Sequence, residues 1–305
     1  MVIKTNKLLI ILVLSLLVNG VFATLFLYPK INKTKDLIKV TKVANDDNLF
    51  DEINPVNGFE INATYDKLGP KMVSSGVIDL KKFKDTYRKS NQPLTAEQEE
   101  ILTKGSSQKI KITRDNSYFL LNFFWAAGLA NKSKILEEGE MVKYKGREGA
   151  GGFASTGGWT LAKSDAMKYY SRSPLVVLTK DQEDRVNLVA ANIFRPCCNN
   201  STAFPDCNHG MALLGVLQVM ASNDVSEKEM YQAGKYFNAF WFPGNYYDLA
   251  LYFKNKESTS FKDVDAKLLL SREYSSASGW QAAKGWLVEK GLLQQPPKQS
   301  GGCGV

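Results

Sequence analysis

The sequence is poor in the side chains that most often supply catalytic nitrogen and sulfur. Its 305 residues include one histidine and four cysteines. It contains neither a GxGxxG nor a GxxxxGK(S/T) run, so no phosphate-binding loop and no nucleotide cofactor are predicted. A Ser-His-Asp triad would need the one histidine, which already lies among the cysteines. We therefore expect any chemistry at the place where these few side chains gather.

Long basic runs are also absent, although the chain is positively charged. Its 39 Lys and Arg residues exceed its 31 Asp and Glu residues, which gives a formal net charge of +8. No RNA- or DNA-binding signature accompanies this charge, so nucleic acid is not an expected partner. The lysines instead favour solubility, or attraction to an anionic surface such as anionic lipid or a cell-wall polymer.

Charge is missing altogether from residues 8–28, LLIILVLSLLVNGVFATLFLY. An apolar segment of about 20 residues is long enough to span a bilayer as one helix. The stretch Val21-Phe22-Ala23 is typical of a signal-peptidase site, but the apolar run continues through Leu27. This continuation favours an uncleaved signal-anchor, a single transmembrane helix within residues 1–29, over a removed signal peptide.

The orientation of this anchor follows from two opposing signals. Lys4 and Lys7 lead directly into the apolar run, which is typical of export and favours a domain outside the cytoplasm. The lysines from Lys30 to Lys42 oppose this orientation under the positive-inside rule. Because large domains translocate largely regardless of charge, we predict a membrane-anchored protein whose main domain is extracytoplasmic.

The rest of the chain predicts a mainly α fold with a minor β or loop region. Helical spacing occurs in residues 77–90, 116–130, 210–222 and 229–242, and the pairs Thr95/Gln98 and Ser226/Glu229 fit capping boxes. Glycine-dense residues 146–162 predict loop or a short hairpin, so any strands are expected near 146–178. The predicted parts are an anchor (1–29), a stalk or linker (30–56), a helical region (57–145), a helical core with the cysteines (146–290) and a flexible Gly/Pro tail (291–305).

Three of the four cysteines and the histidine fall within FRPCCNNSTAFPDCNHG, residues 194–210. Pro196 ends the preceding helix, and Asp206 or Asn208 is the expected N-cap of the next one. Cys207 would then lie near a helix N-terminus, where the dipole favours a thiolate, and Arg195 adds positive charge. The fourth cysteine, Cys303, lies in the terminal SGGCGV and could return to this site.

These side chains form one candidate metal site, with Cys197, Cys198, Cys207, His209 and Cys303 as ligands. Thiolates with one imidazole suit a tetrahedral set and soft ions such as zinc, copper or iron. The spacing Cys-Cys-x8-Cys-x-His fits no common zinc-finger, thioredoxin or haem pattern. The first hypothesis is therefore that the chain binds a soft metal ion through this loop.

Two other interpretations of the cysteines remain open. The chain could be a thiol-disulfide redox enzyme, with Cys207 as the activated thiol and Cys303 as its resolving partner. It could instead be a non-catalytic surface protein in which two disulfides staple the loop and the tail to the helical core. Ser155, Thr156 and Trp159 are candidates to line a site opposite the cysteines, since glycine permits close backbone approach there.

Overall fold

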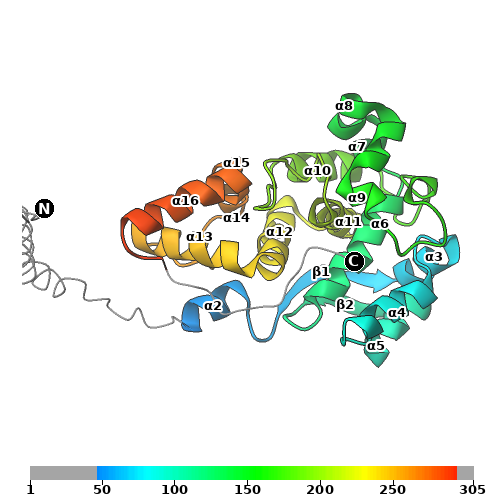
Figure 1. Ribbon diagram of the computed structural model, residues 1–305, viewed down its shortest axis with the longest axis horizontal. Helices are drawn as coiled ribbons and strands as arrows, with labels where there is room; N and C mark the ends of the chain where they lie inside the picture. The colour runs from blue at the N-terminus through cyan, green and yellow to red at the C-terminus, as the bar shows by residue number, and fades with distance from the viewer. Residues whose placement is uncertain (1–46, 294–305) are drawn as a thin grey trace, which may run out of the picture. The chain divides into compact units, whose positions relative to one another are not determined.

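The computed structural model describes residues 47–293, and its elements are mainly helical, as the sequence predicts (Figure 1). Two strands, β1 (Phe59–Asp66) and β2 (Ser106–Ile112), accompany the helices. The helices in chain order are α2 (Asp47–Ile53), α3 (Leu68–Ser75), α4 (Leu80–Lys89), α5 (Ala96–Thr103), α6 (Ser117–Ala130), α7 (Lys134–Glu138), α8 (Glu140–Gly149), η2 (Ala150–Gly152), α9 (Ala154–Gly157), η3 (Ala166–Lys168), α10 (Lys180–Ala191), α11 (Asn208–Ser222), α12 (Glu227–Trp241), α13 (Pro243–Lys256), α14 (Ala266–Leu269), α15 (Arg272–Ser275) and α16 (Ala277–Glu289).

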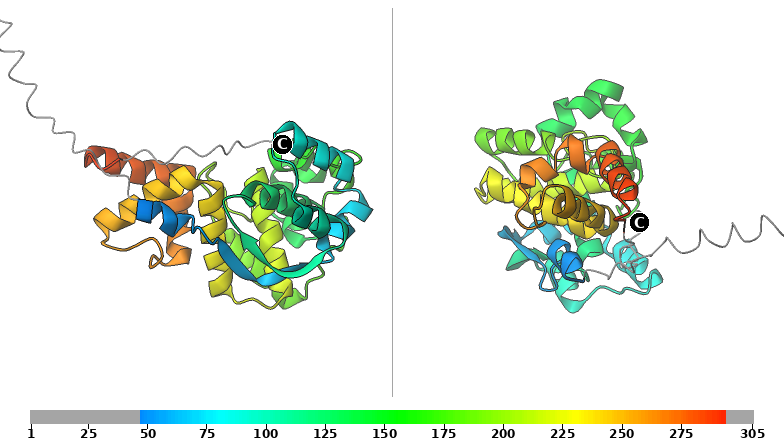
Figure 2. Two further views of the ribbon diagram at one scale, coloured as in Figure 1. Left: turned by 90° about the horizontal axis from the view of Figure 1, so that it is seen from below. Right: turned by 90° about the vertical axis from the view of Figure 1, so that its left-hand side faces the viewer.

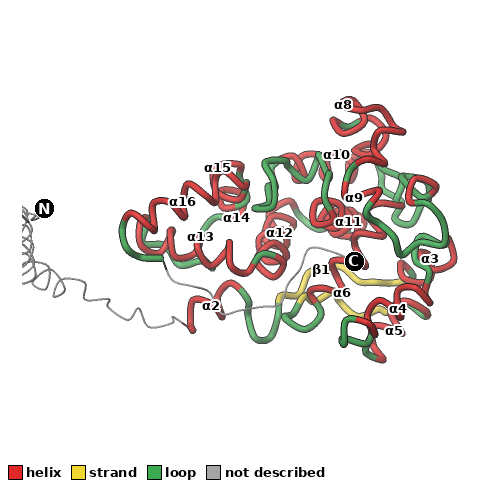
Figure 3. Tube along the Cα trace, in the orientation of Figure 1, coloured by secondary structure: helices red, strands yellow, loops and turns green. Residues whose placement is uncertain are grey.

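The two strands form an antiparallel pair in which Phe59 faces Ile112 and Asp66 faces Ser106. They lie in the segment 57–145, which was expected to be helical, and the segment 146–178 holds short helices with no named strand (Figure 3). The predicted position of the β component was therefore wrong. In β1 the buried side chains of Ile61, Ala63 and Tyr65 alternate with more exposed ones, which is the period of a half-buried strand.

Local sequence signals explain several helix starts. Thr95 and Gln98 cap α5 reciprocally, and Ser226 and Glu229 do the same for α12, so both predicted capping boxes are confirmed. Within the predicted helix 77–90, α4 begins only at Leu80. Asp79 is its N-cap, and the Asp79 carboxylate accepts hydrogen bonds from the backbone N–H groups of the first turn.

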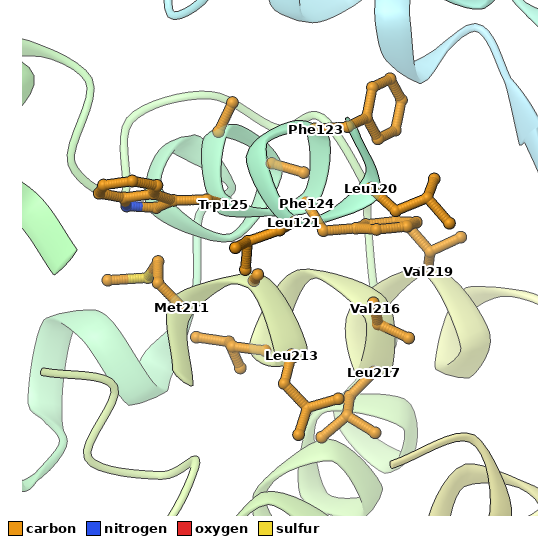
Figure 4. Packing of buried hydrophobic residues seen from close by; sticks show 14 of the residues in the cluster. Leu120, Leu121, Phe123, Phe124, Trp125, Met211, Leu213, Val216, Leu217 and Val219 are labelled. Carbon is orange, nitrogen blue, oxygen red and sulfur yellow. The ribbon is translucent and has the colours of Figure 1, made fainter. Parts of the chain in front are cut away.

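The centre of the main core is the contact between α6 and α11, both of which are buried along most of their length (Figure 4). The helices approach closely because glycines face the partner backbone. A Cβ at Gly128 would lie 2.0 Å from Met211 O, and one at Gly215 would lie 2.5 Å from Phe124 O. This contact holds the first turn of α11, which carries His209, against the core.

A second apolar cluster joins α2, α13 and α16. Leu49, Phe50 and Ile53 of α2 are buried in it, although α2 falls within the predicted stalk segment 30–56. In both views of Figure 2, α13 and α16 run side by side. The cluster places the start of α16 near the segment that carries the cysteines.

The predicted anchor at 1–29, most of the stalk and the tail with Cys303 lie outside the described residues. Within residues 47–293 no helix is both long enough and apolar enough to cross a membrane. Anchoring and orientation therefore stay predictions.

Candidate metal centre

The three described cysteines lie in the segment between α10 and α11, here called the cysteine loop (residues 192–207). Backbone hydrogen bonds fix this loop from several sides. Thr202 N donates to Ile193 O (2.8 Å), which folds the loop back on itself. Phe194 N donates to Leu270 O and Ala277 N donates to Cys198 O, both at 2.8 Å, so the loop is attached to the ends of α14 and α16.

Arg195 belongs to this loop, and its side chain is fully buried. Every nitrogen of its guanidinium has a partner. Nη2 forms an ion pair with Asp206 Oδ1 at 2.6 Å and donates to Phe204 O at 3.2 Å. Nη1 donates to Asn200 O at 3.1 Å, and Nε donates to Cys207 Sγ at 3.0 Å. A buried cation is stable only when it is paired and hydrogen-bonded, so this side chain dictates the path of the loop around it.

Gly210 makes room for this arginine in the first turn of α11. A Cβ at this position would lie 2.5 Å from Arg195 Cζ, closer than any side chain can approach. The N-cap of α11 is Cys207 itself, whose Sγ accepts a hydrogen bond from Gly210 N at 3.4 Å. The expectation that Asp206 or Asn208 would cap the helix was wrong, because the Asp206 carboxylate is instead engaged by Arg195 and by Asn200 Nδ2.

The sulfur atoms of the loop lie close together. Cys197 Sγ is 3.5 Å from Cys207 Sγ and 4.0 Å from Cys198 Sγ. All three residues are free thiols; Cys197 is exposed, whereas Cys198 and Cys207 are half-buried. No disulfide joins any of the described cysteines.

His209 lies in the first turn of α11, near the sulfurs of Cys197 and Cys207. It is buried, with 3% of its surface exposed. Its ring packs against Phe242 at a centroid distance of 4.3 Å and against Trp241 at 5.8 Å. The Nδ1 atom is buried and has no hydrogen-bond partner. A buried polar atom without a partner is costly, so this nitrogen is available to bind a ligand.

The surroundings shift the pKa values of the Cys197 and Cys207 thiols in opposite directions. Hydrogen bonds from the Cys197 and Cys198 thiols lower the pKa of Cys207 well below its ordinary value, and the charge of Arg195 contributes in the same direction. The pKa of Cys197 is raised, first through its hydrogen bond with Cys198 and then through the one with Cys207. Cys207 is therefore the thiol that most readily carries the negative charge that a metal ion requires.

The arrangement has the dimensions of a metal site. One ligand atom each from Cys197, Cys207 and His209 lies within 4.8 Å of the other two, and Cys198 extends the cluster from the side of Cys207. In a tetrahedral zinc site with Zn–S bonds of about 2.3 Å, neighbouring sulfurs are about 3.8 Å apart. The observed spacings of 3.5 and 4.0 Å bracket that value. The cluster can hold a metal ion.

A second subset, formed by Cys198, Asp206 and Cys207, is also compact. Its carboxylate is already paired with the buried guanidinium of Arg195, so a cation there would have to compete with a fixed positive charge. The subset that contains His209 has an unpartnered nitrogen instead. It is the better position for an ion.

The structure brings Cys197, Cys207 and His209 together in one group and places Cys198 beside the other two thiols, whereas the fifth predicted ligand, Cys303, lies outside the described residues. Sequence reasoning gave Arg195 only a general electrostatic role and missed Asn200 and Gly210. The signal was the isolated arginine between Phe194 and Pro196, which lies in the loop because α10 ends at Ala191 rather than just before Pro196 as expected. Among the residues proposed opposite the cysteines, Ser155 contacts the cysteine loop, since its N–H donates to Asp206 O at 3.0 Å.

Comparison of the chain with protein families, with curated proteins and with solved structures found no match.

Proposed function

We propose that this protein binds a soft metal ion through Cys197, Cys198, Cys207 and His209. The observation that carries the proposal is the grouping of Cys197, Cys207 and the buried His209, whose ligand atoms lie within 4.8 Å of one another with the two sulfurs near tetrahedral spacing. Two or three thiolates with one imidazole favour zinc, copper or iron over hard ions such as magnesium or calcium.

Cys303 is proposed as a fifth ligand that exchanges with the others, gating or transferring the ion. The start of α16 touches the cysteine loop through Ala277, and the 13 residues of α16 span about 20 Å at 1.5 Å per residue. Cys303 follows Leu293 by ten residues, which extend at most about 35 Å. The chain length therefore permits Cys303 to return to the loop.

The proposed setting is a membrane surface. The apolar segment 8–28 would anchor the chain, and the charged n-region before it would place the metal domain outside the cytoplasm. The positive net charge would favour contact with anionic lipid or cell-wall polymer.

The two other interpretations make different demands on the cysteines. A redox enzyme based on Cys207 and Cys303 would need the thiol with the lowered pKa to be accessible, and Cys207 is half-buried behind Cys197. A protein with disulfide staples would need Cys207 to be bonded to Cys197 or Cys198, and all three are free. Both features favour metal binding.

Elemental analysis of the full chain, purified without chelator, tests the proposal directly. We expect close to one equivalent of zinc, copper or iron per chain, which His209→Ala and Cys207→Ser each reduce strongly. Asn208→Ala is the matched control, because Asn208 lies between the two ligands and its side chain bonds only the neighbouring backbone. The proposal would be contradicted if the wild type bound no metal after exposure to each of these ions in turn.

A further inference from the structure

The cysteine loop holds two thiols in very different surroundings at contact distance. Cys197 is exposed, and Cys207 lies behind it with its sulfur 3.5 Å away. Sulfur atoms at this distance are in van der Waals contact but unbonded, since a disulfide requires about 2.05 Å. One thiol is thus reachable from solvent, and the other is placed next to it.

Two hydrogen-bond donors hold the sulfur of Cys207 in place beside Cys197. Arg195 Nε donates to Cys207 Sγ at 3.0 Å, and Gly210 N donates to it at 3.4 Å from the first turn of α11. Both donors are fixed, because Arg195 is fully buried and Gly210 belongs to a buried helix. A sulfur fixed in this way, 3.5 Å from the sulfur of Cys197, is placed to resolve a mixed disulfide formed on that neighbouring cysteine.

Cys198 is less suited to either role. Its sulfur faces two oxygen acceptors, Asn200 O and Asp206 Oδ1, each at 3.9 Å, and its backbone oxygen is tied to Ala277. A bond between Cys197 and Cys198 would join adjacent residues, whose Cα atoms are about 3.8 Å apart, less than the usual disulfide minimum of about 4.4 Å.

We propose that Cys197 and Cys207 form a thiol-disulfide exchange site that takes low-molecular-weight disulfides as its substrate class. The Cys197 sulfur gives up its proton, attacks one sulfur of the small disulfide, forms a mixed disulfide and releases the first small thiol. The Cys207 sulfur then gives up its proton, attacks the Cys197 sulfur, closes the Cys197–Cys207 disulfide and releases the second small thiol. The protein loses two electrons, the small disulfide gains two, and the protons of the protein thiols pass to the released thiolates.

This exchange regulates metal binding at the same site. This part of the inference rests on the proposed function. Closing the disulfide removes two of the sulfur ligands at once, so the ion is released, and a bound ion in turn shields both sulfurs from exchange. Metal loading and oxidation therefore exclude each other at one site.

The test uses the full chain with Cys303→Ser, so that the fourth cysteine cannot contribute. The zinc-loaded and the metal-free forms are treated with oxidised glutathione, and free thiols, released glutathione and zinc are counted. Cleavage before Asp206 then separates Cys197 from Cys207, so a Cys197–Cys207 disulfide is detected by mass spectrometry as two linked peptides. Cys198→Ser is the matched control that retains the pair, and Cys197→Ser removes it.

We expect the metal-free chain to lose about two thiols and to release about two glutathiones, with linked peptides in Cys198→Ser but not in Cys197→Ser. The zinc-loaded form should react more slowly and release its ion in step with the disulfide. A stable glutathione adduct on Cys197, or a bond that involves Cys198, would overturn the inference. Linked peptides in a chain that binds no metal would refute the proposed function alone, and retained zinc without linked peptides would refute the inference alone.

Discussion

The buried charge of the Arg195 side chain is compensated by partners from the cysteine loop itself. Its guanidinium has no contact with solvent, and its partners are one carboxylate, two backbone oxygens and a cysteine sulfur of the same short segment. A different path of the loop would remove partners from this buried cation. The thiols are positioned by an arginine rather than by a regular element.

Replacement of Arg195 by methionine should test this dependence. The change keeps much of the side-chain volume but leaves the Asp206 carboxylate, Cys207 and two carbonyl oxygens without their donor. Removing one partner of a buried ion pair costs about 3–5 kcal/mol, and the partial exposure of Asp206 favours the lower end of that range. Urea unfolding of the metal-free chain measures the loss. Arg172→Met, at an exposed arginine, should stay within about 0.5 kcal/mol, and an equal loss in both variants would contradict the argument.

Among the helices, the close contact of α6 with α11 depends on two glycines. Gly128→Ala would place a Cβ 2.0 Å from Met211 O, so the helices must separate. We expect a loss of about 1–3 kcal/mol in the free energy of unfolding, as for other overpacked cores. Gly285→Ala in α16 is the control, because no atom lies within 4 Å of its added Cβ. That exposed substitution should be neutral or should stabilise by about 0.5–1 kcal/mol, since alanine favours a helix interior over glycine. A Gly128→Ala chain as stable as the wild type would contradict this prediction, because it would show that α6 and α11 can separate with no loss in the free energy of unfolding.

The buried Lys235 links α12 to the connection between α13 and α14. Its Nζ donates to Phe261 O and Val264 O, and burial lowers its pKa to about 8. Above about pH 8 the folded chain releases this proton while the unfolded chain, with an ordinary lysine pKa of about 10.4, retains it. The free energy of unfolding should therefore gain a contribution from Lys235 that increases with pH from about 8 upwards.

Urea unfolding of wild type and Lys235→Met between about pH 7 and 9.5 measures this contribution as the difference between the two chains. The difference should change in favour of the wild type as pH rises, because the methionine has no proton to release. Parallel pH profiles would contradict the argument, whatever the absolute stability of the variant.

Sequence patterns located several of the longer helices of residues 47–293 because helix signals are local. The capping box of Thr95 with Gln98 and the apolar run of α6 need no distant partner to be recognised. The strands were missed because β2 presents only Ile110 and Ile112 as buried side chains, and its pairing with β1 closes a connection that contains three helices. The cysteine cluster was predicted from the density of its residues. The unpartnered His209 nitrogen and the arginine under the loop depend on tertiary packing, so composition could not reveal them.

Across residues 47–293, the cysteine loop lies where the two apolar clusters meet. Phe194 accepts a hydrogen bond from Asn238 of α12 and donates to Leu270, while Cys198 accepts one from Ala277 of α16. His209 begins α11 in the main cluster and packs against Phe242 at the start of α13, which belongs to the second one. An ion bound by the loop would thus connect both clusters, and its effect should extend beyond its ligands.

This connection predicts how metal binding alters local stability. An ion that binds only the folded chain stabilises it by about 2.7 kcal/mol at a free concentration of 100 times the dissociation constant. Because the loop is bonded to α16, zinc should slow amide hydrogen exchange both in residues 195–207 and in the first turn of α16, with little change in β1 and β2. Exchange followed by mass spectrometry with and without zinc measures this pattern. His209→Ala should abolish it, and chelator should reverse it in the wild type. Slower exchange confined to residues 195–207 would mean that the loop binds the ion without coupling the two clusters.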